Sequence, residues 1–474
     1  MKSQVSSVLT TNPSEKLFEE TYTRVKCDYK DLCTKFRHKK KDFSKQYAHI
    51  YSVRLSKMKD TLVKRAKQKW GENIPVKRLA ELGEETDLEQ DSERKCVIIG
   101  TLLKNQELRP NILKQISDEL QILPQPKLIR FVSDGDEVLL EDELQRIRLL
   151  GNLDVNSVVT GVVAALLGKQ DGTGKFSVDE VCYAGPQSPS MLTIDPAKPG
   201  RYLVMLSGLD LAHSSDSLLP LRMFTDWVTG WLGDPSEQHK NSKIALVLIA
   251  GNLIRGSSES KDGKIINTNV DSTADLLTSV KMADDLLAEL TETVHVELMP
   301  GEFDPTNLTL PQQPLHYKMF PKASEFSSLH GGTNPHCFQV ENRLVAGSSG
   351  QPIRDIGRYS NITDPLVALK TTLEWGHFAP TAPDTLPCYP YYEEDPFIVE
   401  EQPHIFFSGN HEKFQTDLVT VDYGNGTSQK TRLVCIPSFN KTRTCVVVDL
   451  TTLDCEKVCF NVGEFFISEP MDHS

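Results

Sequence analysis

Two uninterrupted runs of apolar residues constrain the fold of this chain more than any other feature of its sequence. Residues 202–206 read Tyr-Leu-Val-Met-Leu, and residues 244–250 read Ile-Ala-Leu-Val-Leu-Ile-Ala. Runs without polar alternation are typical of strands that are covered on both faces of a sheet. Residues 218–232, between the two runs, and residues 274–290, after them, carry apolar side chains at helical spacing. Alternating strands and helices predict a domain built in α/β layers.

The last part of the chain adds short strand candidates to this domain. They are rich in apolar and β-branched residues, as strands are, and they lie at residues 405–407, 431–436 and 444–448. We therefore expect a second sheet that packs on the first. The layered domain is predicted to span residues 198–466.

A separate block of short strands precedes the layered domain. Its strand signals lie at residues 96–103, 137–143, 145–149, 158–168 and 175–178. Several short strands joined by Gly-containing turns indicate a small β-barrel of the OB type, over residues 94–190. The chain is thus predicted to be a multidomain protein of the α+β or α/β class.

The barrel block is poor in the aromatic residues on which single-stranded nucleic acids stack. It contains only Phe131, Phe176 and Tyr183, together with several acids. OB barrels that bind single strands combine stacked aromatics with a basic groove. This composition favours a protein-binding or purely structural barrel, and single-stranded DNA binding remains as an alternative.

The N-terminal part divides into three segments. Residues 1–42 are polar and without periodicity, which predicts a mobile tail. Residues 43–70 have apolar side chains at spacings of three and four and are expected to be helical, and the acidic residues 81–93 indicate a linker, so that 43–93 form one unit. The basic run at residues 35–41 is compatible with a nuclear signal, a phosphate contact or a solvated charged surface.

Charge and cysteine usage limit the possible partners and compartments. The formal net charge of −13 argues against nucleic acid as the main partner, because such binding depends on Lys and Arg. The ten cysteines show no paired C-x-x-C spacing, which favours reduced core thiols. There is neither a secretory signal nor an apolar run of membrane-spanning length. We expect a soluble, intracellular protein with no membrane partner.

Glycine-containing turns follow four of the predicted strands. These turns read Ser-Gly-Leu-Asp at residues 207–210, Gly-Asn at 251–252, Gly-Glu-Phe-Asp at 301–304 and Gly-Asn-His-Glu at 409–412. Their spacing resembles that of calcineurin-like phosphoesterases, whose turns read Asp-x-His, Gly-Asp, Gly-Asn-His-Asp or Glu, and Gly-His-x-His. Those enzymes need anionic and imidazole ligands to hold two metal ions close together.

In this chain the ligands that the resemblance requires are missing from all four turns. Gly208 and Asp210 stand where Asp and His are expected, and Asn252 replaces the Asp that would bridge both metals. Glu302 and Phe303 replace Asn and His, and a phenyl ring neither ligates a cation nor transfers a proton. The resemblance therefore implies an inactivated phosphoesterase domain without catalytic residues, metal or cofactor, whose degenerate positions are Gly208, Asp210, Asn252, Glu302, Phe303, Asp304, Asn410 and Glu412.

Two other groups of residues leave a metal site open as an alternative. One is Asp210, His213 and Asp216, and the other is Asp304 with His316 and His336. Either would support an active metal-dependent phosphoesterase or nuclease. No Gly-x-Ser-x-Gly elbow, P-loop or Rossmann glycine pattern is present.

Longer phrases of the sequence resemble the small, non-catalytic accessory (B-type) subunits of replicative DNA polymerases, and most closely those of the delta type. The matching phrases lie at residues 43–51, 139–147, 299–307, 310–316 and 380–386. The resemblance spans roughly Phe43 to Phe460, and phrases of this length are specific.

The resemblance implies a nuclear scaffold for DNA replication and repair rather than an enzyme. Its implied partners are the C-terminal domain of the polymerase delta catalytic subunit and a third polymerase subunit, through which the sliding clamp is reached indirectly. The resemblance also implies that the protein acts as a subunit of polymerase zeta in translesion synthesis. Any contact with DNA is expected to be weak or indirect.

Overall fold

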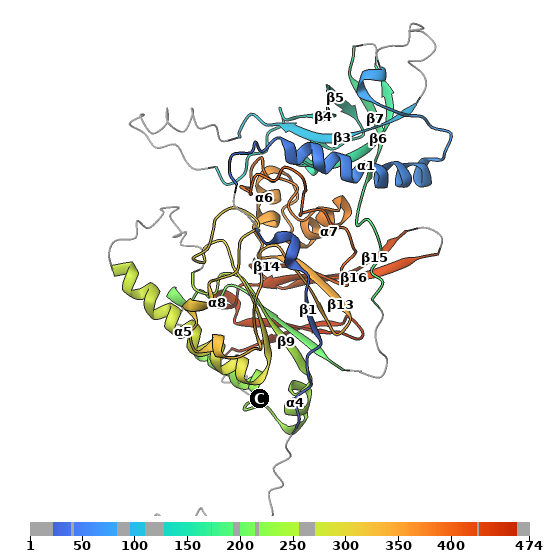
Figure 1. Cartoon of the computed structure of the whole chain (residues 1–474). Coiled ribbons are helices and arrows are strands. Elements are labelled where there is room, and N and C mark those ends of the chain that lie inside the picture. Colours follow the sequence, from blue (N-terminus) through green and yellow to red (C-terminus); the bar gives the residue numbers. More distant parts are fainter. Residues whose placement is uncertain are drawn as a thin grey trace, which may run out of the picture.

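We describe the fold from a computed structural model (Figure 1). The residues it describes are 22–38, 42–82, 95–109, 128–171, 173–192, 200–213, 218–255, 271–423 and 426–461. None of the helices in these ranges is long and apolar enough to cross a membrane.

The large domain is built on two six-stranded sheets. The first contains, in spatial order, β11 (Leu329–Gly331), β10 (His295–Met299), β9 (Ile244–Ala250), β8 (Tyr202–Leu206), β17 (Thr444–Asp449) and β18 (Cys455–Cys459). Its first four strands are parallel, and β17 is antiparallel to both of its neighbours. The two apolar runs form β8 and β9, as predicted, and every residue of β9 is buried.

The second sheet contains, in spatial order, β1 (Tyr29–Asp31), β12 (His336–Val340), β13 (Arg343–Ser348), β14 (Ile405–His411), β16 (Ser428–Pro437) and β15 (Gln415–Asp422). The prediction of a second sheet from the C-terminal strand candidates is therefore confirmed. Apolar side chains of both sheets interdigitate between them, among them Leu203, Leu246, Phe338, Phe407 and Val446.

Helices cover the outer face of each sheet, which gives the domain four layers. On the first sheet lie α3 (Leu218–Thr229) and α5 (Asp271–Thr293), with the short α4 (Pro235–Asn241) and α8 (Phe439–Thr442) at the ends of the layer. On the second sheet lie α6 (Gln351–Tyr359) and α7 (Pro365–Trp375). In Figure 1, α6 and α7 separate the second sheet from the upper part of the molecule.

The upper part is the predicted barrel. It consists of β2 (Val76–Lys77), β3 (Cys96–Asn105), β4 (Glu137–Glu141), β5 (Arg146–Gly151), β7 (Phe176–Tyr183) and β6 (Val163–Gln170). A further pairing of β3 with β6 closes the five longer strands into a barrel, as in OB folds. Because β2 pairs with β3, the barrel sheet begins well before residue 94, where the sequence analysis placed its start.

A long helix, α1 (His49–Trp70), lies between the barrel and the large domain (Figure 1). The predicted helical pattern began at residue 43, but residues 43–48 precede the helix. Leu55, Met58, Leu62 and Ala66 bury one face of α1 against the barrel. The apolar residues that recur at helical spacing along this basic helix therefore form the face that packs on the barrel.

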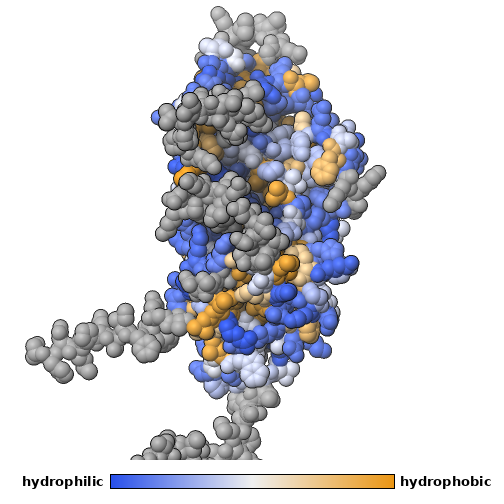
Figure 2. All heavy atoms as spheres, turned by 90° about the vertical axis from the view of Figure 1, so that its left-hand side faces the viewer, coloured by the Kyte–Doolittle hydropathy of each residue, from blue (hydrophilic) through white to orange (hydrophobic). Residues whose placement is uncertain are grey.

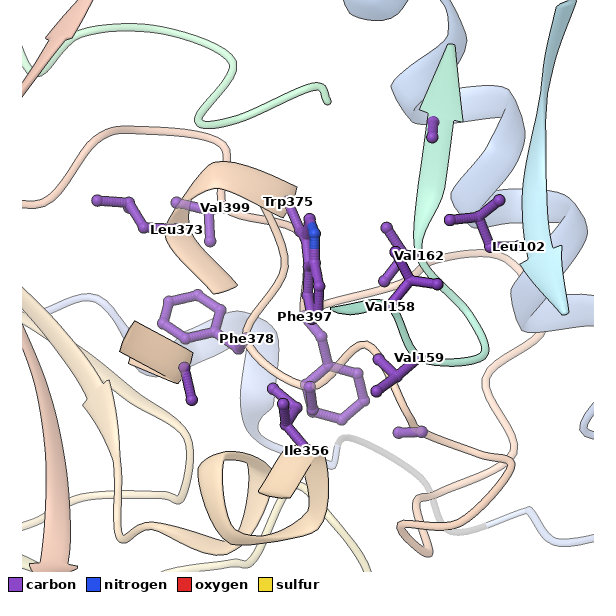
Figure 3. Close-up of a cluster of buried hydrophobic side chains, with 14 of the residues drawn as sticks. Leu102, Val158, Val159, Val162, Ile356, Leu373, Trp375, Phe378, Phe397 and Val399 are labelled. Carbon is purple, nitrogen blue, oxygen red and sulfur yellow. The ribbon is translucent and has the colours of Figure 1, made fainter. Parts of the chain in front are cut away.

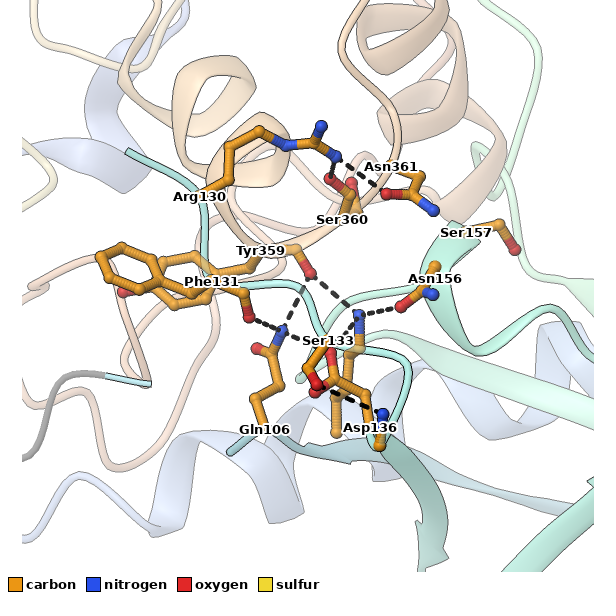
Figure 4. A network of polar contacts seen from close by, with 12 residues as sticks. Gln106, Arg130, Phe131, Ser133, Asp136, Asn156, Ser157, Tyr359, Ser360 and Asn361 are labelled. Atoms are coloured by element: carbon orange, nitrogen blue, oxygen red, sulfur yellow. Dashed lines mark hydrogen bonds and ion pairs between the residues drawn. The ribbon is translucent and has the colours of Figure 1, made fainter. Parts of the chain in front are cut away.

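The barrel and the large domain meet at a seam that is partly apolar and partly polar. Figure 3 shows the apolar part, in which barrel residues Leu102, Val158, Val159 and Val162 face Ile356, Leu373, Trp375, Phe378, Phe397 and Val399. Figure 4 shows the polar part, where the amide of Gln106 donates to the carbonyl oxygens of Phe131 and Tyr359 at 2.8 and 3.3 Å. One continuous core therefore joins the two domains.

The prediction of a mobile tail over residues 1–42 is wrong for residues 22–38. β1 pairs with β12 at the edge of the second sheet, and the 3₁₀ turn Cys33–Phe36 buries Cys33 and Phe36 completely. This segment is ordered by partners some three hundred residues away, which local periodicity does not reveal. Residues 1–21 and 39–41 of the predicted tail, and 83–93 of the predicted linker, lie outside the described residues.

Two residues of the basic run have structural partners. Lys35 donates to the carbonyl oxygen of Ile398 at 3.1 Å, and Arg37 forms an ion pair with Asp31 at 3.1 Å. These contacts explain both side chains without a phosphate or a transport receptor. Whether the run also acts as a nuclear signal stays a prediction.

Candidate functional site

The four glycine-containing turns come together at one end of the two sheets. β8, β9 and β10 are parallel, so their carboxyl ends lie at the same edge. The amide of Gly208 donates to the carbonyl oxygen of Gly251 at 2.9 Å, and the amide of Asp210 donates to that of Asn252 at 3.1 Å. The fold therefore brings the predicted positions of the first two turns into direct contact.

The turn after β10 is organised by Asp304, which is almost completely buried. Its carboxylate accepts hydrogen bonds from the amides of Gly301 at 2.8 Å, Ile254 at 2.9 Å and Leu253 at 3.2 Å. Burial raises the pKa of the Asp304 carboxyl, and these backbone donors oppose that shift. Asp304 thus holds the second and third turns together.

Two asparagines occupy the centre of the group of turns. The side-chain oxygen of Asn252 accepts from the amide of Phe303 at 3.3 Å. From the end of β14, the side-chain amide of Asn410 donates to the carbonyl oxygens of Ser349 at 2.8 Å and Ala250 at 3.2 Å. The side chains at the centre are therefore neutral amides, and their hydrogen bonds are made to other groups of the protein.

The backbone at these turns is held in an uncommon conformation. Asp210, Asn252 and Asn410 have φ values of 49°, 55° and 64°, in the left-handed region that side chains other than glycine seldom adopt. Such conformations persist only where the surrounding structure fixes them, and they often mark functional sites. Here the neighbouring turns supply the hydrogen bonds that fix them.

Close packing leaves little room between the turns. A Cβ added to Gly301 would lie 2.1 Å from the side-chain oxygen of Asn252. One added to Gly208 would lie 2.7 Å from the side-chain oxygen of Asn410 and 2.5 Å from the Ser438 hydroxyl. The glycines are thus required by the close approach of one turn to the next.

Of the remaining predicted positions, Glu302, Phe303 and Glu412 are at least partly exposed and Asp210 is buried, and they do not form a charged cluster. Glu302 forms an ion pair with Arg354 of α6. Phe303 is half-buried and Glu412 is exposed. Asp210 contacts the Nδ1 atom of His213 at 2.9 Å, and the amide of Asn440 approaches its other oxygen at 3.4 Å.

His411, the third residue of the fourth turn and the last of β14, is buried and neutral. Its Nε2 atom lies 2.7 Å from the Ser408 hydroxyl. Burial, assisted by the nearby charge of Arg354, lowers the pKa of His411 to about 4. An imidazole held in this way is a structural element of the strand end rather than a group aimed into an open site.

The alternative metal sites are not assembled by the described residues. His336 lies not beside Asp304 but against Glu297, at 2.9 Å, with both side chains buried. His316 instead accepts from the amide of Lys318 at 3.3 Å. Asp216 lies outside the described residues. Across the described ranges, no three His, Cys, Asp or Glu side chains are grouped to hold a metal ion.

Sequence reasoning missed the buried polar side chains that support the turns. The side-chain amide of Asn334 donates to Gln312 at 2.7 Å, to the Ser349 hydroxyl at 2.8 Å and to Gln351 at 3.0 Å. Similarly, the Ser207 hydroxyl accepts from the amide of Asn410 at 2.8 Å. A Ser-Gly pair directly after an apolar strand, as at 207–208 and 349–350, was the available signal.

The three aromatic residues of the barrel are all engaged in packing. Phe176 is completely buried. Phe131 stacks on Tyr359 at 5.1 Å, and Tyr183 packs against Trp375 at 6.3 Å between ring centroids. This arrangement does not provide the stacking platform that single-stranded nucleic acids use.

Comparisons with known proteins match both domains to polymerase subunits. Residues 203–416 match the family model of the B-type subunits of DNA polymerases alpha and epsilon, and residues 46–181 match that of the DNA polymerase delta subunit OB-fold domain. The first match covers the layered domain from β8 to β14, and the second covers α1 and the barrel up to residue 181, near the end of β7.

Whole-chain relatives carry the same description. The chain is 40% identical to DNA polymerase delta subunit 2 of Drosophila melanogaster, over 93% of this chain and 99% of the relative. It is 37% identical to the DNA polymerase delta small subunit of Arabidopsis thaliana, over 94% and 98%. It is 29% identical to that of Saccharomyces cerevisiae, over 90% and 91%.

Proposed function

The chain belongs to the family of DNA polymerase delta small subunits, and from that premise we propose that it is a non-catalytic scaffold within the polymerase. As an accessory subunit of polymerase delta it serves DNA replication. In our proposal it bridges the C-terminal domain of the catalytic subunit to a third subunit, supports processive synthesis and repair, and reaches the sliding clamp only indirectly. Sharing with polymerase zeta, a nuclear location and weak or indirect DNA contact belong to the same proposal.

We infer further that the layered domain is an inactivated phosphoesterase. The observation that carries this inference is the state of the four turns. They keep their glycines, their left-handed backbone and their mutual hydrogen bonds, while Asn252 and Phe303 stand where charged and imidazole ligands would be needed. A neutral amide cannot replace the negative charge that keeps two cations close together.

The rigid union of the two domains supports a bridging role. Arg54 of α1 is completely buried and donates to Asp395 and to three carbonyl oxygens, those of Gly161, Pro380 and Ala382. These partners belong to both domains. A scaffold needs binding surfaces at fixed distances, and a barrel fixed to a layered domain provides them.

Exposed apolar side chains also fit a protein that is surrounded by partners. Figure 2 shows apolar groups among the polar ones on the face toward which α5 lies. Leu218, Leu219 and Leu277 on α3 and α5 are 42%, 56% and 60% exposed, and Trp231 is 82% exposed. Aromatic and aliphatic side chains of this kind are typical anchors of protein interfaces.

Co-expression with the C-terminal domain of the polymerase delta catalytic subunit, followed by gel filtration, tests the proposal. We expect one stable complex with an interface larger than roughly 1,000 Å², the usual minimum for a specific contact. If the two chains elute separately at micromolar concentration, with each shown to be folded, the scaffold proposal fails.

The absence of catalysis has its own test. Highly pure protein is incubated with phosphodiester and phosphomonoester substrates and Mn²⁺ or Mg²⁺, and we expect no turnover. Turnover that disappears in Asp304→Ala or Asp210→Ala would identify an active phosphoesterase. Tight, sequence-independent binding of short single-stranded DNA at physiological salt would instead support the single-strand-binding alternative.

A further inference from the structure

A cavity of about 580 Å³ lies between the start of α1, the barrel and the loop at residues 383–384. It is lined by Tyr51 and Leu55 of α1, by Leu102 of β3 and by Asp384 of the large domain. It is separate from the four turns, none of whose residues line it. It opens where three different parts of the chain meet, so its shape depends on the seam.

The inner part of the cavity combines an apolar wall with one unpartnered hydroxyl. Leu55 is 6% exposed and Leu102 is completely buried. The hydroxyl of Tyr51 is buried, and no described group forms a hydrogen bond with it. A buried hydroxyl without a partner costs free energy, so this position favours a ligand that forms a hydrogen bond with it, as acceptor or as donor.

The outer part of the cavity carries an excess of negative charge. Glu141, Asp142, Glu143 and Asp384 all line it, against one lining cation, Arg146. Arg146 already pairs with Glu141 at 3.1 Å.

The other lining carboxylates differ in their contacts. Asp384 pairs with Arg109 at 2.9 Å. Asp142 accepts the amides of Leu144 and Gln145. Glu143 is exposed to solvent at the edge. Two cations therefore face four carboxylates, and the remaining field attracts a further cation and repels phosphate.

Apolar side chains border the acidic opening. Leu144, in the turn between β4 and β5, is 83% exposed. On the α1 side, Tyr47, which lines the cavity, is 48% exposed. A small cationic ligand would leave these groups in water, whereas a polypeptide would cover them.

We propose that this cavity accepts a Lys or Arg side chain from another polymerase delta subunit, while an adjacent apolar residue of that subunit packs against Leu144 and Tyr47. The cation lies among the carboxylates, and its N–H group donates to the Tyr51 hydroxyl. The inference rests on the proposed function, because it takes the occupant from the same polymerase. It adds the place on this chain and the chemistry of the partner segment.

Two variants test the proposal in the full-length chain. Tyr51→Phe removes only the hydroxyl, and Glu143→Lys reverses a charge at the exposed edge. The purified catalytic and third subunits are tested separately. We expect each variant to weaken binding about tenfold to the subunit that supplies the side chain, since hydrogen bonds and ion contacts to charged groups are of this size. Glu72→Lys is the matched control because Glu72 is also exposed but lies just beyond the far end of α1, roughly 30 Å away at 1.5 Å per residue.

Photo-crosslinking identifies the occupant. A benzoylphenylalanine at position 144 should label a partner peptide that contains Lys or Arg next to an apolar residue. Cavity variants that bind like the wild type, labelling only of this chain's residues 110–127, or labelling of DNA would each overturn the inference. If the wild-type chain assembles with neither subunit, the proposed function itself fails, whereas assembly unaffected by both variants refutes the cavity alone.

Discussion

The seam between the domains and the group of strand-end turns both bury polar side chains, but they satisfy them in opposite ways. At the seam, Arg54 and Asp395 form an ion pair at 2.7 Å, and His377 lies 3.0 Å from the same carboxylate oxygen. At the turns, the central side chains are the neutral amides of Asn252 and Asn410. At the seam a buried carboxylate is paired with a cation. At the turns neutral amides stand at the centre, and the buried carboxylate of Asp304 is satisfied by backbone amides instead.

This difference teaches that burial of polar groups does not by itself indicate an active site. The seam has the charged cluster that a search for catalytic residues would select, yet every part of it is used in joining the domains. The turns have the geometry expected of a site, yet their hydrogen bonds are directed at one another. Function must therefore be argued from the partners of each group and not from its polarity.

The largest effect is expected at the seam. Arg54→Leu should lower the free energy of unfolding by about 3–5 kcal/mol, because it leaves the buried carboxylate of Asp395 without its cation. Urea denaturation measures the change. The control is Lys59→Leu, an exposed position on the same helix, which should change stability by less than about 0.5 kcal/mol. An Arg54 variant as stable as that control would show that the seam does not depend on this network.

A smaller effect is expected at the turns. Asp304→Ala removes the acceptor of three backbone amides and should cost about 2–3 kcal/mol. Glu302→Ala is the control, since its ion pair with Arg354 is partly exposed and such pairs contribute about 0–1 kcal/mol. If Asp304→Ala instead raises the free energy of unfolding, the buried carboxylate destabilises the fold and does not link the turns.

Much of the fold was predictable because strong local sequence patterns determine it. The apolar runs of β8 and β9 and the glycine turns after them depend on neighbours in the sequence, and the structure has them as predicted. The barrel strands were found for the same reason, although their ends differ by several residues. Turn glycines such as Gly301 were recognisable, because close approach of two backbones excludes any side chain.

The parts that sequence reasoning missed depend on distant partners. β1 is a three-residue strand whose polar pattern becomes a strand only at the edge beside β12. Arg54 looked like one of several basic residues on an amphipathic helix, and nothing nearby in the sequence indicates Asp395 or the carbonyl oxygens that surround it. Both require contacts across hundreds of residues, which spacing along one chain does not encode.

Acid should destabilise both regions over the same pH range. Burial lowers the pKa of His377 at the seam and of His411 at the turns, each to about 4. An unfolded His titrates near 6.5, so the unfolded state binds more protons below that pH, and stability should fall as pH drops from about 6.5 to 4. His336, whose pKa is raised to about 9 by Glu297 against the effect of burial, contributes stability that is lost as pH rises through 9.

Removing each neighbouring cation sharpens this comparison. Arg54 lowers the pKa of His377, and Arg354 lowers that of His411. In Arg354→Leu the pKa of His411 should rise while that of His377 stays the same, as followed by NMR of the imidazole protons. A matched rise at both histidines would mean that the two regions are electrostatically coupled, and the contrast between them would be lost.

The smallest effect, none within error, is expected from metal ions at the turns. Millimolar Mn²⁺ should leave the Tm unchanged within about 1 °C, because Asn252 and Asn410 already donate to and accept from the protein, and Gly208 provides no ligand. The assay is sensitive, since a site filled at one hundred times its Kd would add about 2.7 kcal/mol. Asn252→Asp alone should also fail to create a site, because the phenyl ring of Phe303, which in the proposed inactivated phosphoesterase stands in place of an imidazole, cannot ligate a metal. A Tm rise with Mn²⁺ that is abolished by Asp210→Ala would place a metal at the turns and would remove the distinction between a seam held by an ion pair and turns centred on neutral amides.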